Sequence, residues 1–273
     1  MHAFICTACG TQYAPRAAPP GECTICEDER QYVPPRGQTW TTLPALAVSH
    51  GNAWRQYEPG IIGIGTQPQF AIGQRALLIR TPGGNVLWDC ISLLDDATVT
   101  LIAALGGVKA FAISHPHFYT TMVEWSRAFG VPAHVHAADE RWIMRPDPCL
   151  KLWQGETLAL LPGVTLIRGG GHFPGGAMLH WADGAGGGGV LCASDIAAVT
   201  TDRKFLTFMR SYPNLIPLAA RQVEAIGRML EPFAFDAVYG IFFDRVIVSG
   251  GKEVLKASVD RYVAALAGAY EQG

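Results

Sequence analysis

The sequence has few charged residues and no long uninterrupted apolar run. Asp, Glu, Lys and Arg make up 16% of the 273 residues, against about a quarter in an average globular protein. Hydrophobic residues make up 49%, which excludes intrinsic disorder because disorder needs low hydrophobicity and high charge. No stretch reaches the roughly 18 apolar residues of a membrane-spanning helix. The N-terminus lacks the charged-then-apolar layout of a secretory signal, so we expect a soluble, cytoplasmic protein.

A strong charge of one sign is also missing. The formal net charge is -2, so no global basic field would attract nucleic acid, and no nucleic-acid or membrane partner is expected. The glycine run 186–189 is not followed by Gly-Lys-Ser or Gly-Lys-Thr. It therefore does not predict a phosphate-binding loop.

Four of the seven cysteines form two Cys-x2-Cys pairs near the start of the chain: Cys6, Cys9, Cys23 and Cys26. Four thiolates at this spacing can surround one tetrahedral zinc ion, and a segment as small as residues 1–36 needs such a staple to fold. A disulfide framework would leave an odd cysteine. The stretch CTACGTQY is similar to rubredoxin, which keeps iron as an alternative metal. We therefore predict a metal-binding module over residues 1–36 and a second domain over 37–273.

Beyond residue 36, strand and helix patterns alternate. The predicted strands cover residues 70–81, 85–89, 108–114, 131–135, 164–167, 178–182, 190–193 and 235–241. The predicted helices are one capped by Asp95 and Asp96, one that carries Met122, Trp125 and Phe129, one from Pro217 to before Pro232, and one over about 252–267. This order predicts a layered α/β or α+β architecture.

Histidines supply the most informative motif. His115 and His117 follow a predicted strand, and Pro116 between them favours an extended His115. In extended chain, residues two apart point to the same side, so both imidazoles could reach one ion. His172 follows three glycines and Asp195 follows another strand, and three imidazoles with a carboxylate suit an open metal site. Three further histidines are expected to be ordinary structural residues: His134, His136 and His180.

The order His-x-His after a strand, then Gly-Gly-His, then Ala-Ser-Asp, resembles the metallo-β-lactamase fold superfamily over about residues 60–245. The earlier stretch NVLWDC, which ends its strand at Asp89, is similar too. The resemblance implies a four-layer αβ/βα sandwich with metal between the two sheets at one edge. It also implies His115, His117 and His172 as ligands of a first metal, with Asp195 at the place of the carboxylate that bridges two metals in binuclear members.

The sequence departs from this family at the second metal. The family motif continues His-x-His-x-Asp-His, whereas here Tyr119 and Thr120 stand at the last two positions. No histidine follows His180, so the late histidine of the second site is absent. Asp195 alone is too little to bind a second ion stably. We therefore predict a mononuclear three-histidine site.

A three-histidine zinc site with an open position is typical of hydrolysis, because the bound ion lowers the pKa of water to about 7. The expected activity is hydrolysis of an ester, thioester, amide or phosphoester, with a small molecule as substrate. Asp195 is the candidate to orient the water, and Tyr119 the candidate to hydrogen-bond the water or the substrate oxyanion. Oligomeric state stays open, a homo-oligomer included.

Two alternatives remain open at this point. In the first, the chain is a non-catalytic metal-binding protein whose four-cysteine module contacts a protein or nucleic acid. In the second, iron in that module supports redox chemistry; the loss of the carboxylate-rich second site that di-iron chemistry needs argues against it.

Overall fold

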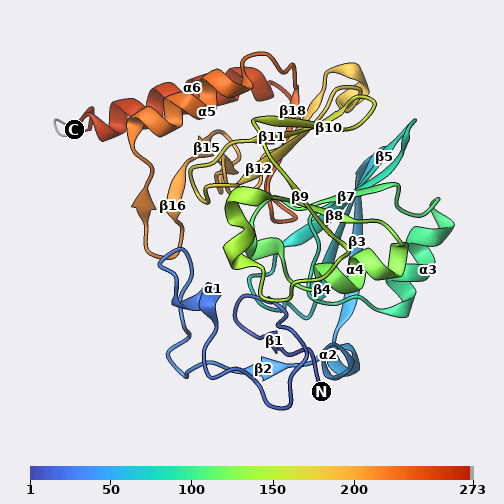
Figure 1. Ribbon diagram of the computed structural model, residues 1–273. Helices are drawn as coiled ribbons and strands as arrows, with labels where there is room; N and C mark the ends of the chain where they lie inside the picture. The colour runs from blue at the N-terminus through green and yellow to red at the C-terminus, as the bar shows by residue number, and fades with distance from the viewer. Residues whose placement is uncertain (271–273) are drawn as a thin grey trace. The chain divides into compact units, whose positions relative to one another are not determined.

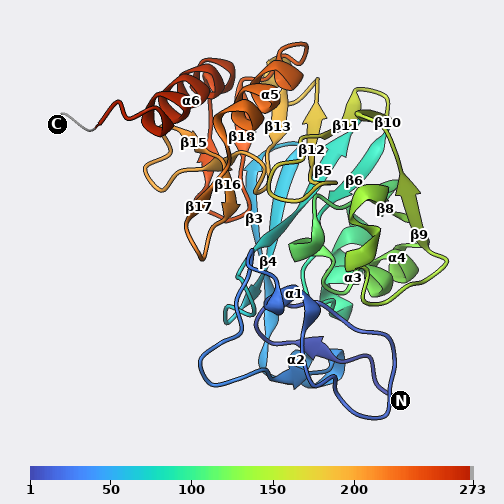
Figure 2. The same ribbon diagram turned by 60° about the vertical axis from the view of Figure 1, so that its left-hand side comes forward.

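The computed structural model describes residues 1–270. The chain divides into two compact units, Met1–Gln154 and Gly155–Gly273, called unit 1 and unit 2 below. Figures 1 and 2 show the ribbon in two views. The expected division into residues 1–36 and 37–273 is a different one, and it stays a prediction.

Unit 1 is built on a seven-stranded sheet in simple chain order. Its strands pair antiparallel from β3 to β6 and parallel from β6 to β9. They are β3 (Gly51–Glu58), β4 (Ile61–Gln67), β5 (Arg75–Thr81), β6 (Gly84–Trp88), β7 (Ala110–Ala112), β8 (Ala133–His136) and β9 (Leu150–Trp153). Parallel neighbours need crossover connections, and helices α3 (Asp96–Ala104) and α4 (Met122–Phe129) provide the first two of these.

Helix α3 begins where the sequence predicts. The side chain of Asp95 accepts a hydrogen bond from the backbone N–H of Thr98 at 2.8 Å, which caps the start of α3. Helix α4 ends at Gly130, whose φ of 65° is in the left-handed region that favours glycine.

Two sequence-based expectations in unit 1 are wrong in detail. The strand predicted over 70–81 begins only at Arg75, because Gly73 has a φ of +80° that breaks the extended path. His115 is extended as predicted, with φ −167° and ψ 172°, but Pro116–Phe118 forms a 3-10 turn, η1. The extended-chain argument therefore does not explain how His117 is oriented.

The cysteine-rich segment belongs to unit 1. Strand β1 (Ile5–Cys6) pairs with β2 (Trp40–Thr41). Helix α1 (Thr24–Glu27) begins directly after Cys23, the first cysteine of the second pair. Helix α2 (Leu43–Ser49) leads from β2 into the sheet. The segment folds with only these short elements, as expected of a module that depends on a metal staple.

Unit 2 has its own six-stranded sheet, in the order β10-β11-β12-β13-β18-β19. All neighbours are antiparallel except β13 and β18, which are parallel. The strands are β10 (Thr157–Leu161), β11 (Val164–Arg168), β12 (Ala177–Trp181), β13 (Val190–Cys192), β18 (Ala237–Tyr239) and β19 (Val246–Ile247). Two small hairpins follow β13: β14 (Ala198–Val199) with β15 (Leu206–Thr207), and β16 (Met209–Ser211) with β17 (Ile216–Pro217).

Helices α5 (Ala220–Leu230) and α6 (Gly251–Leu266) lie side by side in unit 2, as Figure 2 shows. Val223, Ile226 and Leu230 of α5 are buried in one hydrophobic cluster with residues of the sheet. The helix predicted from Pro217 starts three residues later, because Pro217 lies in β17. Its predicted end before Pro232 is confirmed.

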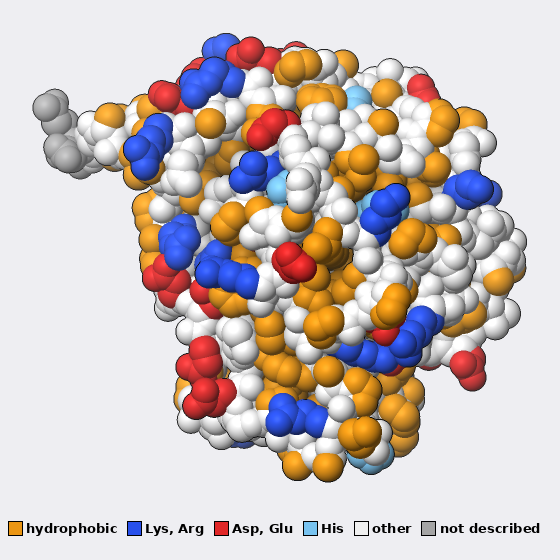
Figure 3. Space-filling view, viewed as in Figure 1, with side chains coloured by type: hydrophobic (Ala, Val, Ile, Leu, Met, Phe, Trp, Pro, Cys, Tyr) orange, Lys and Arg blue, Asp and Glu red, His pale blue; other side chains and the backbone are white. Residues whose placement is uncertain are grey.

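Mixed sheets with helices in each unit confirm the layered α/β architecture. Among residues 1–270, no helix combines the length and apolar character that crossing a bilayer requires. Figure 3 shows acidic and basic side chains interspersed on the face it presents, in keeping with the small net charge.

Candidate metal sites

Four cysteine sulfurs gather in unit 1, as the spacing predicts. The Sγ atoms of Cys6, Cys9, Cys23 and Cys26 lie within 4.8 Å of one another, and all four residues are buried. The Cys6–Cys26 and Cys9–Cys23 sulfur pairs are each 3.6 Å apart, too far for a disulfide of about 2.05 Å. Sulfurs bound to one tetrahedral ion at about 2.3 Å would lie about 3.8 Å apart. The cluster therefore has the dimensions of a four-thiolate metal site.

Neighbouring groups donate hydrogen bonds to these sulfurs. The side-chain amide of Gln38 donates to Cys6 Sγ at 2.9 Å, and the hydroxyl of Tyr13 donates to Cys23 Sγ at 3.5 Å. Hydrogen bonds from Cys23 and the other clustered cysteines lower the pKa of Cys6. Donors around a sulfur favour its thiolate, which is the form that binds metal.

His115 and His117 lie together in unit 1, directly after β7. Both are buried, their ring centroids are 5.1 Å apart, and each offers a ligand nitrogen within 4.8 Å of the other's. The side-chain amide of Gln74 donates to the His117 carbonyl at 3.0 Å, which fixes the turn of η1.

A hydrogen-bonded chain from Asp89 through Ser114 determines which ring nitrogen of His115 carries the proton. Asp89 Oδ1 accepts hydrogen bonds from the backbone N–H of Ser114 at 2.7 Å and from its hydroxyl at 2.8 Å. Ser114 Oγ also lies 2.9 Å from His115 Nδ1. Because the single hydroxyl proton is directed to the carboxylate, Oγ accepts from Nδ1–H, and the lone pair is left on His115 Nε2. Asp89 itself holds a φ of 62°, a strained conformation of the kind found at functional sites.

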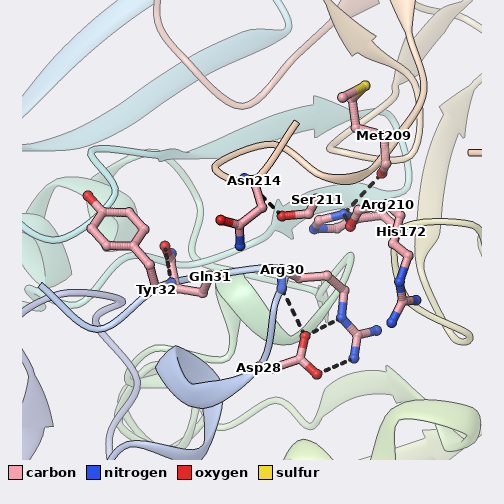
Figure 4. Close-up of polar contacts among 9 residues, drawn as sticks. All are labelled: Asp28, Arg30, Gln31, Tyr32, His172, Met209, Arg210, Ser211 and Asn214. Carbon is pink, nitrogen blue, oxygen red and sulfur yellow. Dashed lines mark hydrogen bonds and ion pairs between the residues drawn. The ribbon is translucent and has the colours of Figure 1, made fainter. Parts of the chain in front are cut away.

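His172 is held in the same way in unit 2. Its Nδ1 lies 2.9 Å from the carbonyl oxygen of Arg210 and 3.2 Å from that of Met209, both on β16 (Figure 4). A carbonyl oxygen only accepts, so Nδ1 carries the proton and Nε2 carries the lone pair. The ring is buried, and Nε2 is therefore the atom available to a metal.

Asp195 is the neighbour of His172 in unit 2. Both residues are buried and offer ligand atoms within 4.8 Å of one another. The Tyr212 hydroxyl donates to the Asp195 backbone carbonyl at 3.1 Å, while its ring packs edge-on against His172 with centroids 5.6 Å apart. The segment that begins at β16 thus supports both ligand candidates of this unit.

The structure therefore brings the predicted residues together in three groups: the four cysteines, His115 with His117, and His172 with Asp195. That the two histidine-containing pairs bind one ion stays a prediction. Tyr119 is buried in unit 1, and burial followed by the negative charge of Asp139 raises its pKa well above the usual value. Its phenol stays protonated at neutral pH and can donate a hydrogen bond; its catalytic role stays a prediction.

The sequence did not predict the supporting roles of Ser114, Gln38 and Tyr212. Ser114 could have been noticed, since it adjoins the first histidine and can relay a hydrogen bond from a carboxylate. Gln38 and Tyr212 contact residues 32 and 17 positions away, and no local pattern marks such contacts.

The three histidines expected to be structural have protein partners. His134 Nδ1 lies 3.0 Å from the Phe111 carbonyl, and His180 Nε2 lies 2.6 Å from the Ala234 carbonyl. His136 Nδ1 accepts from the backbone N–H of Ala138 at 3.1 Å. In the part of the chain that the structure describes, none of them joins a cluster of metal-ligating groups, as expected.

Comparison with known proteins gives one close sequence relative and many structural ones. The uncharacterized protein YmaE of Bacillus subtilis (strain 168) is 47% identical over 268 residues, which cover 97% of both chains. No protein-family model matches the chain.

Among solved structures, the metallo-β-lactamase FIM-1 from Pseudomonas aeruginosa in its mono-zinc form matches with a TM-score of 0.58 and 10% identity, over 78% of this chain and 96% of that one. TTHA1623 in a di-iron-bound form matches with a TM-score of 0.51 and 19% identity, over 70% and 96%. These likenesses show the fold, and they confirm the metallo-β-lactamase resemblance predicted from the sequence.

A first prediction concerns the hydrogen bond from Gln38 to Cys6. Replacing Gln38 with Leu removes this donor, and we expect metal in the cysteine cluster to be released about tenfold faster, the lower end for loss of a supporting hydrogen bond. Transfer of zinc from the protein to a coloured chelator measures the rate. Gln56→Leu, the same change at an exposed position of β3, should leave it unchanged. Equal release from all three proteins would contradict the role assigned to Gln38.

A second prediction concerns pH and His180. Burial, with a smaller contribution from Lys252, lowers the pKa of His180 below its ordinary 6.5. The unfolded chain therefore binds a proton that the folded chain resists, so stability is lost as pH falls below about 6.5. We expect the unfolding free energy of metal-free protein to decrease from pH 7.5 to 5.5, and to decrease less in His180→Gln. Urea unfolding measures both, and an equal decrease in the variant would refute the assignment.

Proposed function

The chain belongs to the family of the Bacillus subtilis protein YmaE and has the metallo-β-lactamase fold, and from this premise we propose that it is a mononuclear metal-dependent hydrolase. Its substrate would be a small-molecule ester, thioester, amide or phosphoester. The observation that carries the proposal is the hydrogen bonding of two imidazoles through Nδ1. His115 and His172 each commit Nδ1 to a protein oxygen and keep the lone pair on Nε2, as metal-ligating histidines do.

The donor set fits zinc. We propose that His115, His117 and His172 hold one ion and that Asp195 lies at its open side; three imidazoles are a common zinc set in hydrolytic enzymes. FIM-1, with the same fold, has been solved with a single zinc, which supports a one-metal site in this fold. When bound, such an ion would lower the pKa of a water molecule to about 7, which makes that water easier to deprotonate at neutral pH.

The protein's own groups would do the rest of the work. Asp195 accepts a hydrogen bond from the attacking water and takes up its proton. Tyr119, kept protonated by burial, donates to the oxyanion that develops on the substrate.

Tyr119 and Thr120 stand at the motif positions of a second metal site, and neither is suited to bind a metal in this chain. The Thr120 hydroxyl lies 3.2 Å from Cys90 Sγ, and a protonated phenol at Tyr119 is a poor ligand. These substitutions support one ion rather than two.

We further propose that the four-cysteine cluster binds a structural zinc. The sulfurs are buried and the segment has little regular structure, so the bound ion would contribute folding free energy directly. Among residues 1–270 no cysteine forms a disulfide, which supports zinc binding in a reducing compartment such as the cytoplasm.

A third prediction concerns metal content. Purified protein should hold about two zinc ions per chain, and His115→Ala/His117→Ala should hold one, because the cysteine cluster is unaffected. The matched control is His134→Ala/His136→Ala, which removes two histidines at the same spacing that have structural partners. Elemental analysis of folded protein decides between the outcomes. An unchanged metal count in the His115→Ala/His117→Ala variant would overturn the proposed site.

A fourth prediction concerns Asp195 in catalysis. A panel of ester, thioester, amide and phosphodiester substrates should reveal hydrolysis that a chelator abolishes. Asp195→Asn should lower kcat/KM by about a hundredfold or more, the range for removal of a general base, while the metal count stays near two. Unchanged turnover by Asp195→Asn would remove Asp195 from the mechanism.

A further inference from the structure

The first cysteine turn, residues 6–12, is called the knuckle here. It is closed by hydrogen bonds from the backbone N–H of Cys6 to the carbonyl of Thr11 at 3.0 Å and from the N–H of Gly10 to the carbonyl of Cys6 at 2.9 Å. Two of the four metal-binding sulfurs, those of Cys6 and Cys9, belong to it. A metal bound to these sulfurs would therefore fix the path of the knuckle backbone.

The knuckle packs directly on the loop that follows the two histidines of unit 1. The backbone N–H of Gln12 donates to the carbonyl of Thr120 at 2.9 Å, and the hydroxyl of Ser92 donates to the carbonyl of Gly10 at 3.1 Å. Gly10 has a φ of +84°, and a Cβ atom there would lie 2.3 Å from Ser92 Oγ and 3.5 Å from Thr120 Cγ2. Only glycine fits this interface without displacing its neighbours.

The residues that the knuckle contacts are themselves bonded to one another. The Thr121 hydroxyl lies 3.0 Å from the carbonyl of Ile91 and 3.1 Å from that of Ser92. Cys90 Sγ lies 3.4 Å from the carbonyl of Phe118, the residue after His117. Residues 90–92 and 118–121 thus form one buried, hydrogen-bonded block beneath the knuckle.

This block leads to both histidines. Asp89, immediately before it, holds Ser114 and through it the ring of His115. The block's other segment begins next to His117. Thr120, which stands where the family motif has its second-site histidine, gives its carbonyl to the knuckle. A position that serves a second metal elsewhere in the family here joins the cysteine module to the ligand loop.

We propose that the metal bound by the four cysteines positions His115 and His117 for the hydrolytic metal, through the knuckle and this block. The inference rests on the proposed function. Without the cysteine-bound ion the backbone of the knuckle is no longer fixed, and the hydrogen bonds that Gln12 and Gly10 make with Thr120 and Ser92 are lost. The loop that carries His115 and His117 then becomes more flexible, and binding of the hydrolytic metal must first order it. The two sites are therefore coupled, and binding at either strengthens binding at the other.

Gly10→Ala tests the contact while leaving all four cysteines in place. Cobalt titration follows the two sites separately, because thiolate-to-cobalt charge-transfer bands report only the cysteine cluster. Zinc competition with a chelator gives the affinity of the second ion. We expect the charge-transfer bands to remain and the affinity of the second ion to fall about tenfold or more, as when a ligand loses its support. Gly21→Ala, in the same segment with open space around the new methyl group, should behave as the parent.

Two further variants keep the test decisive if Gly10→Ala folds poorly. Ser92→Ala deletes only the hydroxyl that donates to Gly10 and should weaken the second ion in the same direction. Cys26→Ser removes a ligand outside the knuckle and should weaken both ions. An unchanged affinity for the second ion in folded Ser92→Ala and Cys26→Ser would overturn the coupling and leave the proposed function standing. A parent chain that binds only the cysteine-held ion would overturn both.

Discussion

The proposed hydrolytic metal site depends on which ring nitrogen carries the proton in two histidines. A neutral histidine binds metal through one ring nitrogen only when the other carries the proton, and in both units a protein oxygen holds that proton on Nδ1. Ser114, itself donating to Asp89, does this for His115, and the carbonyls of Met209 and Arg210 do it for His172. Each unit thus presents a histidine whose Nε2 carries the lone pair that binds a metal, and the hydrolytic proposal follows from this arrangement.

The cysteine module contacts the residues that support the histidines of unit 1. Its knuckle is not a separate appendage, because Gln12 and Gly10 bond to the residues that support the histidines. Tyr119 and Thr120 stand where the family motif has ligands of a second metal, and the knuckle, whose cysteines would hold an ion of their own, contacts one of these positions through the hydrogen bond from Gln12 to Thr120.

The sequence predicted more of the site than of its support. Cysteine spacing identified the four-sulfur cluster, since each Cys-x2-Cys turn brings two sulfurs together and a tetrahedral ion needs both pairs. His115 and His117 were found for a partly wrong reason, because η1 replaces the expected extended path. The strand start at Arg75 was missed since Phe70 to Ile72 look apolar, whereas the backbone leaves the extended path at Ala71, with a φ of 52°, and at Gly73, with a φ of 80°. Tyr212 and Gln38 act through contacts between distant segments, which no local pattern encodes.

The central claim is that one ion is shared by His115, His117 and His172. A crystal structure of the zinc-loaded full chain, with anomalous scattering at the zinc edge, tests it most directly. The account predicts one anomalous peak in the cysteine cluster and one more, about 2.0–2.1 Å from Nε2 of each of the three histidines. Rings that point to no common peak, or two peaks that share Asp195, would contradict it.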